Sequence, residues 1–207
     1  MQAYPVLPVR LWPSQQETAK ADFLNEHTVV FGLVLPQGFP RDAARQELRL
    51  IACQFLSDCF QVSPDHLEFH NEPGKKSRIY LHGKEIFTSL SHEDGLSVIA
   101  FSLLQVPGVD IVKADPDFNW PDIAHLYLGE RKTRKILELP ATQRLHQFAL
   151  AWSMLEAKLK CLGMPLTEFS AIENQQMKTH APLRYYHLNL PHNYAGSLVT
   201  KDPDGAG

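Results

Sequence analysis

Carboxylate and ammonium side chains stand at spacings that suit a metal ion and a phosphate. Asp110 interrupts the apolar run Val106–Val112, where a charge is costly to bury without a partner. Glu156 and Lys160 are four residues apart in a helical segment, so they lie on one face. Oxygen ligands of this kind are preferred by Mg²⁺ when it also binds substrate phosphates. A carboxylate beside a cation can accept a proton from a hydroxyl and offset charge on a phosphate.

Each of these features also has an ordinary structural explanation. A Glu156–Lys160 pair at helical spacing is often a solvated surface pair that contributes little stability. Trp152, on the same helix face, is expected to anchor the helix by packing. His92, which follows Ser91 after a strand-like segment, is by itself more typical of a hydrogen-bonded core or turn residue than of a phosphate ligand. The functional interpretation therefore depends on the segments being taken together.

In this order, three segments resemble the signature motifs of a known enzyme family. Ser89–His92 is similar to a Ser-His motif, Gly108–Ile111 to a Gly-x-Asp-x-Glu motif, and Trp152–Lys160 to a Trp-x-x-Lys-Glu-Ala-x-x-Lys motif. These motifs mark the surfactin-synthetase-activating (Sfp-type) class of 4'-phosphopantetheinyl transferases. The resemblance extends from Ile86 to Gly163.

The resemblance implies both a fold and a reaction. The fold is α+β, a pseudo-dimer of two similar α/β halves with antiparallel sheets. We expect the halves at about residues 1–104 and 105–207, with the active site between them, and a monomer, because the two halves supply both sides of the cleft. The implied reaction moves the 4'-phosphopantetheine arm of coenzyme A to a serine of an apo acyl or peptidyl carrier protein and releases 3',5'-ADP.

The family's functional residues carry over onto the matching positions. Asp110 and Glu156 would bind Mg²⁺, with Mn²⁺ as an alternative because both ions accept oxygen ligands. Glu156, directly or through water, would take the proton from the carrier serine, and Lys160 would assist the departure of 3',5'-ADP. The nucleotide end of coenzyme A would be held by Arg45, Lys75, Ser91 and His92. Positive charge is concentrated between the second and third motifs, at Arg131, Lys132, Arg134 and Lys135. These residues either attract an acidic carrier protein or form only a solvated helix end.

Two positions depart from the family's pattern. Val112 stands where the second motif has glutamate, and Leu155 where the third has lysine. The first change removes one of three carboxylates, so metal binding should be weaker; water could fill the place, and Asp115 and Asp117 are near in sequence. A non-catalytic relative that binds a coenzyme A-like nucleotide or a carrier protein is therefore an alternative. An unrelated metal-dependent hydrolase built on Asp110, Glu156 and histidines is less favoured, because the ten histidines show no His-x-x-x-His or similar ligand spacing on a predicted helix.

The elements that must position these residues follow from hydrophobic periodicity and turn signals. A buried strand is predicted at Val29–Leu35, followed by a helix that Pro40 opens. One face of that helix repeats apolar residues at spacings of three and four: Leu48, Ile51, Phe55 and Cys59. Gly83 and Asp94-Gly95 favour turns of an antiparallel meander, whose strands are predicted at Leu67–His70, Arg78–His82, Ile86–Leu90 and Leu96–Leu104.

The second part of the chain alternates in the same way. Val106–Val112 is a predicted strand, and helical patterns run over Asp122–Leu137 and Thr142–Leu162, the latter ended by Gly163. A final hairpin is predicted from strands at Arg184–Leu190 and Ala195–Thr200. Helices combined with antiparallel strands are typical of an α+β fold.

The net charge, the first residues and the cysteines exclude several classes of function and location. The net charge of -3 argues against nucleic-acid binding, which needs a basic surface. Met1–Pro13 does not resemble a secretory signal, and the longest strongly apolar stretch, Thr28–Leu35, is too short to span a bilayer. We therefore expect a soluble, cytoplasmic protein. The three cysteines form no Cys-x-x-Cys pair, so they are expected to be buried thiols rather than disulfides or zinc ligands.

Overall fold

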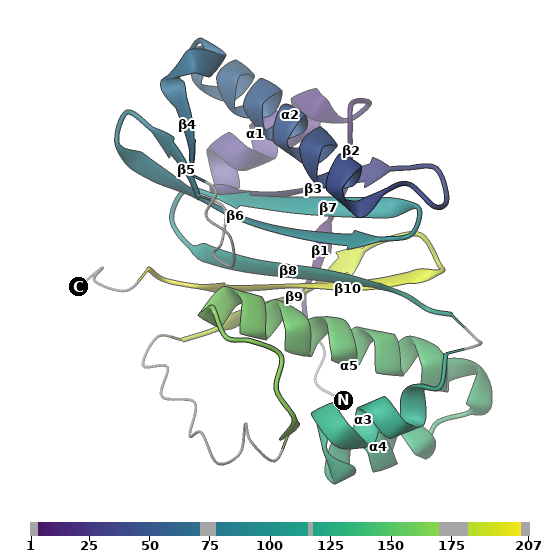
Figure 1. Ribbon diagram of the computed structural model, residues 1–207. Helices are drawn as coiled ribbons and strands as arrows, with labels where there is room; N and C mark the ends of the chain where they lie inside the picture. Colours follow the sequence, from purple (N-terminus) through teal and green to yellow (C-terminus); the bar gives the residue numbers. More distant parts are fainter. Residues whose placement is uncertain (1–3, 71–77, 116–117, 170–181, 204–207) are drawn as a thin grey trace.

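Two β-sheets lie face to face in the computed structural model, and helices cover the outer face of each sheet (Figure 1). The structure describes residues 4–70, 78–115, 118–169 and 182–203. The four-stranded sheet has the order β1 (Val6–Pro8), β9 (Arg184–Asn189), β10 (Tyr194–Lys201) and β8 (Val106–Lys113). The six-stranded sheet has the order β2 (Arg10–Leu11), β3 (Thr28–Val34), β7 (Leu96–Ser102), β6 (Lys84–Glu93), β5 (Arg78–Leu81) and β4 (Leu67–His70).

Alternating side chains along the central strands form the core between the two sheets. Val98 and Ala100 of β7 face Val109 and Ile111 of β8 and Leu198 of β10 in one buried cluster. Because successive side chains of a strand point to opposite faces, the residues between them face outward toward the helices. The apolar strand predicted at Val106–Val112 and the strand predicted at Leu96–Leu104 both contribute to this core.

Two helices cover the outer face of the six-stranded sheet: α1 (Gln16–Glu26) and α2 (Arg41–Phe60). Four aromatic rings make the centre of this layer, with neighbouring centroids 4.6 Å to 6.4 Å apart: Phe23, Phe31, Phe55 and Phe101. The predicted apolar face of α2 is confirmed, because all four of its expected core residues are buried. A short 3-10 helix, Pro64–His66, leads from α2 into β4.

The outer face of the four-stranded sheet is covered by α5 (Ala141–Leu162), with α3 (Trp120–Leu128) and α4 (Glu130–Leu137) beyond it. The single helix predicted over Asp122–Leu137 is wrong in one respect, because two helices occupy that range. Gly129 separates them at φ 78°, a backbone conformation that glycine adopts without steric cost. Gly163 ends α5 in the left-handed conformation, as predicted.

The two layers repeat one order of elements. In the first, β3 pairs antiparallel with β7, and β7 with β6, while α2 follows β3 in the chain. In the second, β8 pairs antiparallel with β10, and β10 with β9, while α5 lies between β8 and β9 in the chain. The mixed, antiparallel-rich α/β architecture agrees with the α+β class expected from the sequence.

The structure also shows where the three cysteines lie and how long and apolar the helices are. Cys53, Cys59 and Cys161 are free thiols, and burial raises the pKa of the Cys59 thiol to about 12. Cys59 and Cys161 are buried and Cys53 is half-buried, close to what the sequence predicts. In the described ranges, no helix has the length and apolar character needed to cross a bilayer.

Candidate active site

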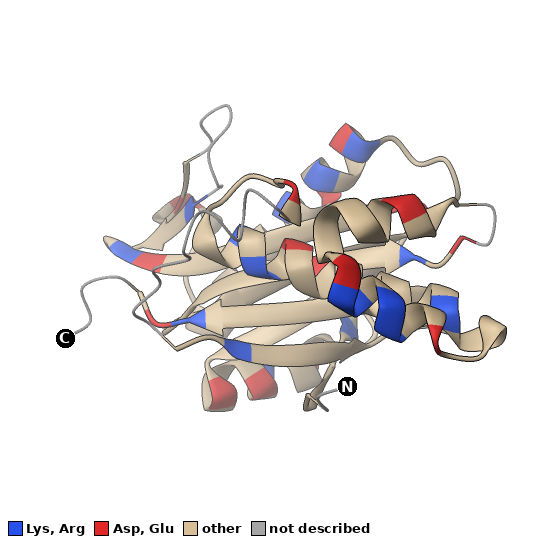
Figure 2. Ribbon diagram, turned by 90° about the horizontal axis from the view of Figure 1, so that it is seen from below, with Lys and Arg blue, Asp and Glu red and all other residues tan. Residues whose placement is uncertain are grey.

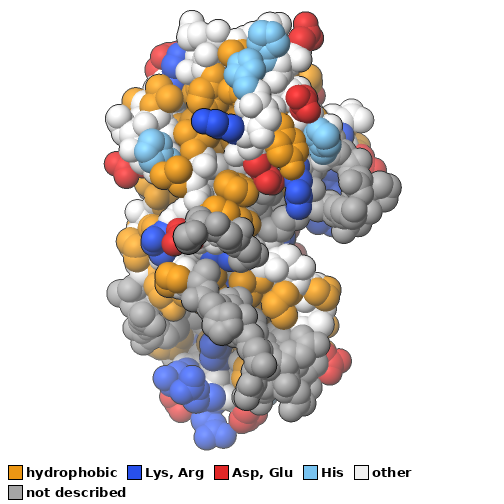
Figure 3. Space-filling model, turned by 90° about the vertical axis from the view of Figure 1, so that its left-hand side faces the viewer, with side chains coloured by type: hydrophobic (Ala, Val, Ile, Leu, Met, Phe, Trp, Pro, Cys, Tyr) orange, Lys and Arg blue, Asp and Glu red, His pale blue; other side chains and the backbone are white. Residues whose placement is uncertain are grey.

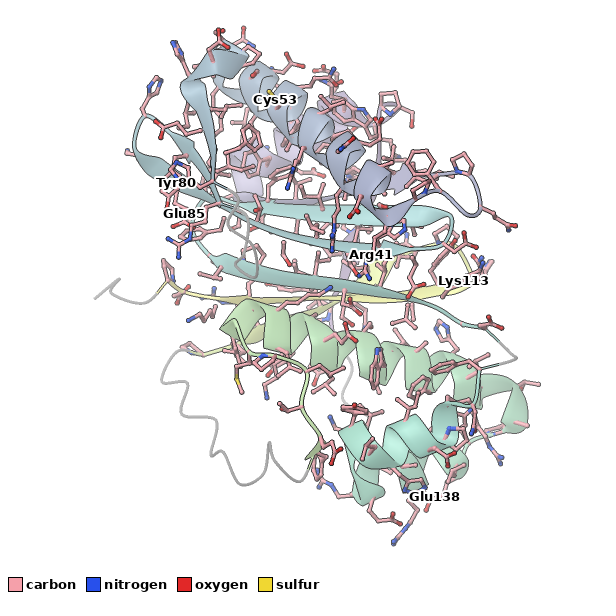
Figure 4. All side chains as sticks on the ribbon, viewed as in Figure 1. Arg41, Cys53, Tyr80, Glu85, Lys113 and Glu138 are labelled. Atoms are coloured by element: carbon pink, nitrogen blue, oxygen red, sulfur yellow. The ribbon has the colours of Figure 1, made fainter. Side chains whose placement is uncertain are left out.

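A polar pocket of about 360 Å³ opens where β6, β8, α5 and the start of α2 meet. All three sequence motifs contribute to it. Its walls are Arg41, Ser91, His92, Glu93, Asp94, Asp110, Ile111, Val112, Trp152, Glu156 and Lys160. In Figure 4, Arg41 is labelled beside β6, below the start of α2. Two larger hollows, of about 480 Å³ and 620 Å³, contain none of the predicted metal-binding or catalytic residues.

The close packing of α5 on β8 places Asp110 in this pocket. Val109 and Ile111 face the core between the sheets, so Gly108 and Asp110 point toward α5. A side chain on Gly108 would collide with the backbone of Ala157 and Cys161. The glycine of the second motif therefore lets the helix approach close enough to cover Asp110, which is only 3% exposed.

Asp110 is held by a hydroxyl and an ammonium group. Ser91 Oγ donates a hydrogen bond to Asp110 Oδ1 at 2.8 Å, and Lys160 Nζ lies 2.7 Å from the same oxygen. Lys160 Nζ also donates to the carbonyl oxygen of Val109 at 3.2 Å. Burial raises the pKa of Asp110, and Lys160 opposes that rise. The predicted metal ligand and the predicted catalytic lysine are thus in direct contact.

Glu156 lies one helical turn before Lys160 and lines the same pocket. Burial raises its pKa, and the negative charge of Asp110 raises it further. A carboxylate with a raised pKa is a better proton acceptor. Trp152, one turn earlier, lines the pocket but also packs against Tyr127 and Phe148, with ring centroids 5.3 Å and 5.9 Å away. Its expected anchoring role is supported by these contacts.

His92 lines the pocket in a fixed orientation. Its Nδ1 forms a 2.7 Å hydrogen bond with Ser97 Oγ on β7. Burial lowers the pKa of His92, and the positive charges of Arg41 and Arg45 lower it further. A neutral imidazole is therefore favoured near neutral pH, and it can still donate a hydrogen bond to a phosphate.

The pocket receives a different arginine from the one that the sequence indicates. Arg45 is exposed and pairs with Asp42 at 3.2 Å, whereas Arg41, one turn earlier on α2, lines the pocket. The charge of Arg41 acts on His92 and Glu156. Arg41 is thus a candidate phosphate ligand that sequence matching missed. Lys75 lies outside the described residues.

Glu93 is a second residue that the sequence interpretation missed. It is the last residue of β6 and is half-buried in the pocket wall. Burial raises its pKa, and so does the negative charge of Asp110 and, more weakly, that of Glu156. The signal in the sequence is the alternation Ser89, Ser91, Glu93, which places all three side chains on one face of a strand.

The basic residues of α4, grouped in Figure 2, lie beside another hollow. Arg131, Lys132 and Lys135 line the hollow of about 620 Å³ together with apolar residues of α5. Arg134 instead pairs with Glu130 at 3.1 Å. The residues of α5 that line this hollow differ from those that line the polar pocket around Asp110. The two hollows therefore open on different sides of the helix. The role of these cations in carrier binding stays a prediction.

The other histidines that the structure describes lie outside this pocket. Figure 3 shows several on the upper half of the face that carries β4 and β5. The rings of His66 and His82 are 5.4 Å apart, and His70 packs against Tyr80. Over the ranges that the structure describes, no three His, Cys, Asp or Glu side chains already lie close enough to hold a metal ion.

Asp110, Glu156 and Lys160 therefore share one pocket, on a strand and a helix that lie in a single stretch of chain. Residues 107–201 match the family model of the 4'-phosphopantetheinyl transferase superfamily. The matched stretch covers β8 to β10 and includes these three residues, whereas Arg41, Ser91, His92 and Glu93 lie before it. The match supports a transferase of this general family. No curated protein matches the chain significantly.

The superfamily uses coenzyme A as donor, generally with Mg²⁺, and the donor set of the pocket fits such an ion. Asp110, Glu156 and Glu93 carry carboxylate oxygens of the kind that Mg²⁺ prefers. Burial, and after it the negative charge of Asp110, raises the pKa of Glu93 and Glu156. A divalent cation among them would offset that negative charge. Lys160 provides part of this compensation at Asp110.

Proposed function

We propose that this protein transfers the 4'-phosphopantetheine arm of coenzyme A to a serine of an apo acyl or peptidyl carrier protein. The observation that carries the proposal is the meeting of Asp110, Glu156 and Lys160 in one pocket, inside the segment that matches the superfamily. Ser91 and His92, from the Ser-His motif, line the same pocket, and Ser91 donates a hydrogen bond to Asp110.

The reaction exchanges one phosphate ester for another. The hydroxyl oxygen of the carrier serine forms a bond to the β-phosphorus of coenzyme A. The bond from that phosphorus to the oxygen bridging the two phosphates breaks, and 3',5'-ADP leaves with the electron pair. The serine proton passes to Glu156, directly or through a water molecule. Such transfer depends mainly on positioning and on compensation of charge.

Residues of this chain supply the positioning. Asp110 and Glu156 would hold Mg²⁺, or Mn²⁺ in its place, and the ion would neutralise charge on the pyrophosphate. Lys160 stands beside Asp110, where its ammonium group can offset charge on the leaving phosphate. His92 can donate a hydrogen bond to the nucleotide end, and Arg41 adds a positive charge to the lining of the pocket.

The proposal also covers the remaining parts of the assembly. The repeated order of β3, β7 and β6 with α2, and of β8, β10 and β9 with α5, supports a pseudo-dimer of halves near residues 1–104 and 105–207. A monomer would then hold a complete cleft. Arg45 and Lys75 would contribute at the nucleotide end, and Arg131, Lys132, Arg134 and Lys135 would attract an acidic carrier at long range.

A non-catalytic binding protein is the second candidate. The observation in its favour is the short contact between Lys160 and Asp110, because the ammonium group lies where a cation would be held. Val112 and Leu155 also favour this candidate, since they replace a carboxylate and a lysine of the family pattern. This candidate would bind coenzyme A without needing a metal.

The deciding experiment is mass spectrometry of several apo acyl and peptidyl carrier proteins incubated with this protein, coenzyme A and Mg²⁺. We expect at least one carrier to gain the mass of one phosphopantetheine arm, with an equal amount of 3',5'-ADP released. A reaction with chelator in place of Mg²⁺ is the control. Coenzyme A binding with no mass gain on any carrier would instead identify the non-catalytic protein.

A further inference from the structure

We propose that Glu93 supplies the third metal-binding carboxylate of this pocket, in place of the carboxylate that position 112 lacks. The inference rests on the proposed function, because it concerns the metal of that same site. It assigns a ligand role to the end of β6, a segment that lies before the matched residues 107–201.

The register of β6 against β8 brings Glu93 to the end of β8, next to the position of Val112. Ser89 Oγ accepts a hydrogen bond from the backbone N–H of Val109 at 3.0 Å. Ser91 Oγ accepts one from the N–H of Ile111 at 3.3 Å. The two strands therefore advance together, and two residues later Glu93 comes level with Lys113, the residue that follows Val112.

Contacts at the ends of the two strands confirm that they remain side by side there. Lys113 Nζ lies 2.9 Å from Asp94 Oδ2. Lys113 directly follows Val112, and Asp94 directly follows Glu93. The Lys113–Asp94 pair therefore joins the residues next to Val112 and Glu93. Glu93 and Val112 both line the pocket itself.

The direction of the Glu93 side chain agrees with this placement. Ser91 and Glu93 share one face of β6 because side chains alternate along a strand. Ser91 uses that face to reach Asp110, at 2.8 Å. Electrostatics support the proximity, because the negative charge of Asp110 raises the pKa of Glu93. A carboxylate from β6 thus enters the pocket next to the gap that Val112 leaves.

Other nearby carboxylates fit the role less well. Asp94 already accepts hydrogen bonds from the Gly38 N–H at 2.7 Å and from Lys113, and these partners lower its pKa. Asp115 is not part of the pocket wall, and Asp117 lies outside the described residues. Glu93 also accepts a hydrogen bond, from the backbone N–H of Asp94, but it has no lysine partner among the contacts described and lines the same pocket as Asp110 and Glu156.

The test measures metal binding rather than catalysis. Mn²⁺ alone is titrated into the purified full-length protein, and the free ion is counted by electron paramagnetic resonance. We expect Glu93→Gln to weaken Mn²⁺ binding by at least about tenfold, since even residues that only support a ligand cost that much when changed. Glu85→Gln is the matched control. Glu85 lies on the same strand but pairs with Arg78 at 3.8 Å, outside the pocket wall.

A second variant separates ligation from a structural effect. Val112→Glu in the Glu93→Gln background restores a carboxylate from the neighbouring strand, and we expect it to recover most of the lost Mn²⁺ affinity. Unchanged affinity in Glu93→Gln, or no recovery in the double variant, would overturn the ligand assignment. If the ligand assignment failed but the wild-type protein still modified a carrier, the proposed function would stand. If the Mn²⁺ measurements came out as expected but no carrier were modified, the ligand role of Glu93 would stand and the proposed function would fail.

Discussion

Lys160 Nζ lies 2.7 Å from Asp110 Oδ1, so a lysine of the third motif is paired with the aspartate of the second. The same ammonium group contacts the carbonyl oxygen of Val109 and the hydroxyl of Ser91. One side chain from α5 thereby links both strands that line the pocket. Asp110 is buried and Lys160 is about one third exposed, so the aspartate depends on this partner more than the lysine does.

Removing the lysine should therefore destabilise the fold. Lys160→Met leaves Asp110 without a cation, and loss of one partner of a buried pair costs about 3 kcal/mol or more. Urea denaturation near neutral pH measures the change. Adding Asp110→Asn should recover most of the loss, because no buried charge then remains. Equal stability of Lys160→Met and the wild type would show that the contact contributes nothing.

Magnesium should stabilise the protein more strongly as pH rises. The pKa values of Asp110, Glu93 and Glu156 are all raised, with burial the first cause. Their protonated forms therefore contribute stability below the ordinary carboxyl pKa, and this contribution is lost as pH rises through the raised values. A bound cation offsets that loss only when the groups are ionised.

Thermal unfolding with and without Mg²⁺ at about pH 5 and about pH 8 checks this sign. We expect a larger rise of Tm with Mg²⁺ at the higher pH. Asp110→Asn is the control and should largely remove the effect. A Tm shift that is equal at both pH values would contradict a metal site built from these carboxylates.

Glu156→Gln should abolish transfer without unfolding the protein. Loss of a positioned general base lowers a rate by about 10²–10⁴, and loss of a metal ligand lowers it further. The rate of carrier modification and the circular dichroism spectrum are the two measurements. Glu138→Gln, at the end of α4 and outside the pocket wall (Figure 4), should keep the wild-type rate. Full activity of Glu156→Gln would disprove the assigned base.

Arg41 and Arg45 should differ in their effect on coenzyme A. Arg41 lines the pocket, whereas Arg45 is paired with Asp42 on the exposed side of α2. A hydrogen bond to a charged phosphate contributes about 1.5–3 kcal/mol, so Arg41→Ala should raise the Kd for coenzyme A about tenfold or more. Isothermal titration calorimetry measures both variants. The opposite order, with Arg45→Ala the weaker binder, would restore the assignment made from sequence.

Gly108→Ala should damage both stability and transfer. The added Cβ would meet the backbone of Ala157 and Cys161, which cannot rotate away as a side chain can. Overpacking of this kind costs about 1–3 kcal/mol, and any shift of α5 would separate Glu156 from Asp110. Urea denaturation and carrier modification measure the two effects. A fully stable Gly108→Ala variant would show that α5 is less closely seated on β8.

Strong periodicity made several elements predictable. The apolar faces of α2 and α5 and the strands from β3 to β10 are long or sharply bounded by turn residues. The split at Gly129 was missed because the residues on both sides of it favour helix. The first two strands were missed for another reason. β1 and β2 are very short and pair in parallel with strands distant in the chain, which leaves no local pattern.

The sequence by itself determined the chemistry of the pocket, because Asp110, Glu156 and Lys160 belong to motifs whose residue types and spacing are local. Only the tertiary structure decided which further side chains join them. Arg41 and Glu93 enter the pocket because α2 and β6 pack where they do, and the distance between segments after folding is not encoded in their separation along the chain. The same packing brings Lys160 onto Asp110, a pairing set by the close seating of α5 on Gly108.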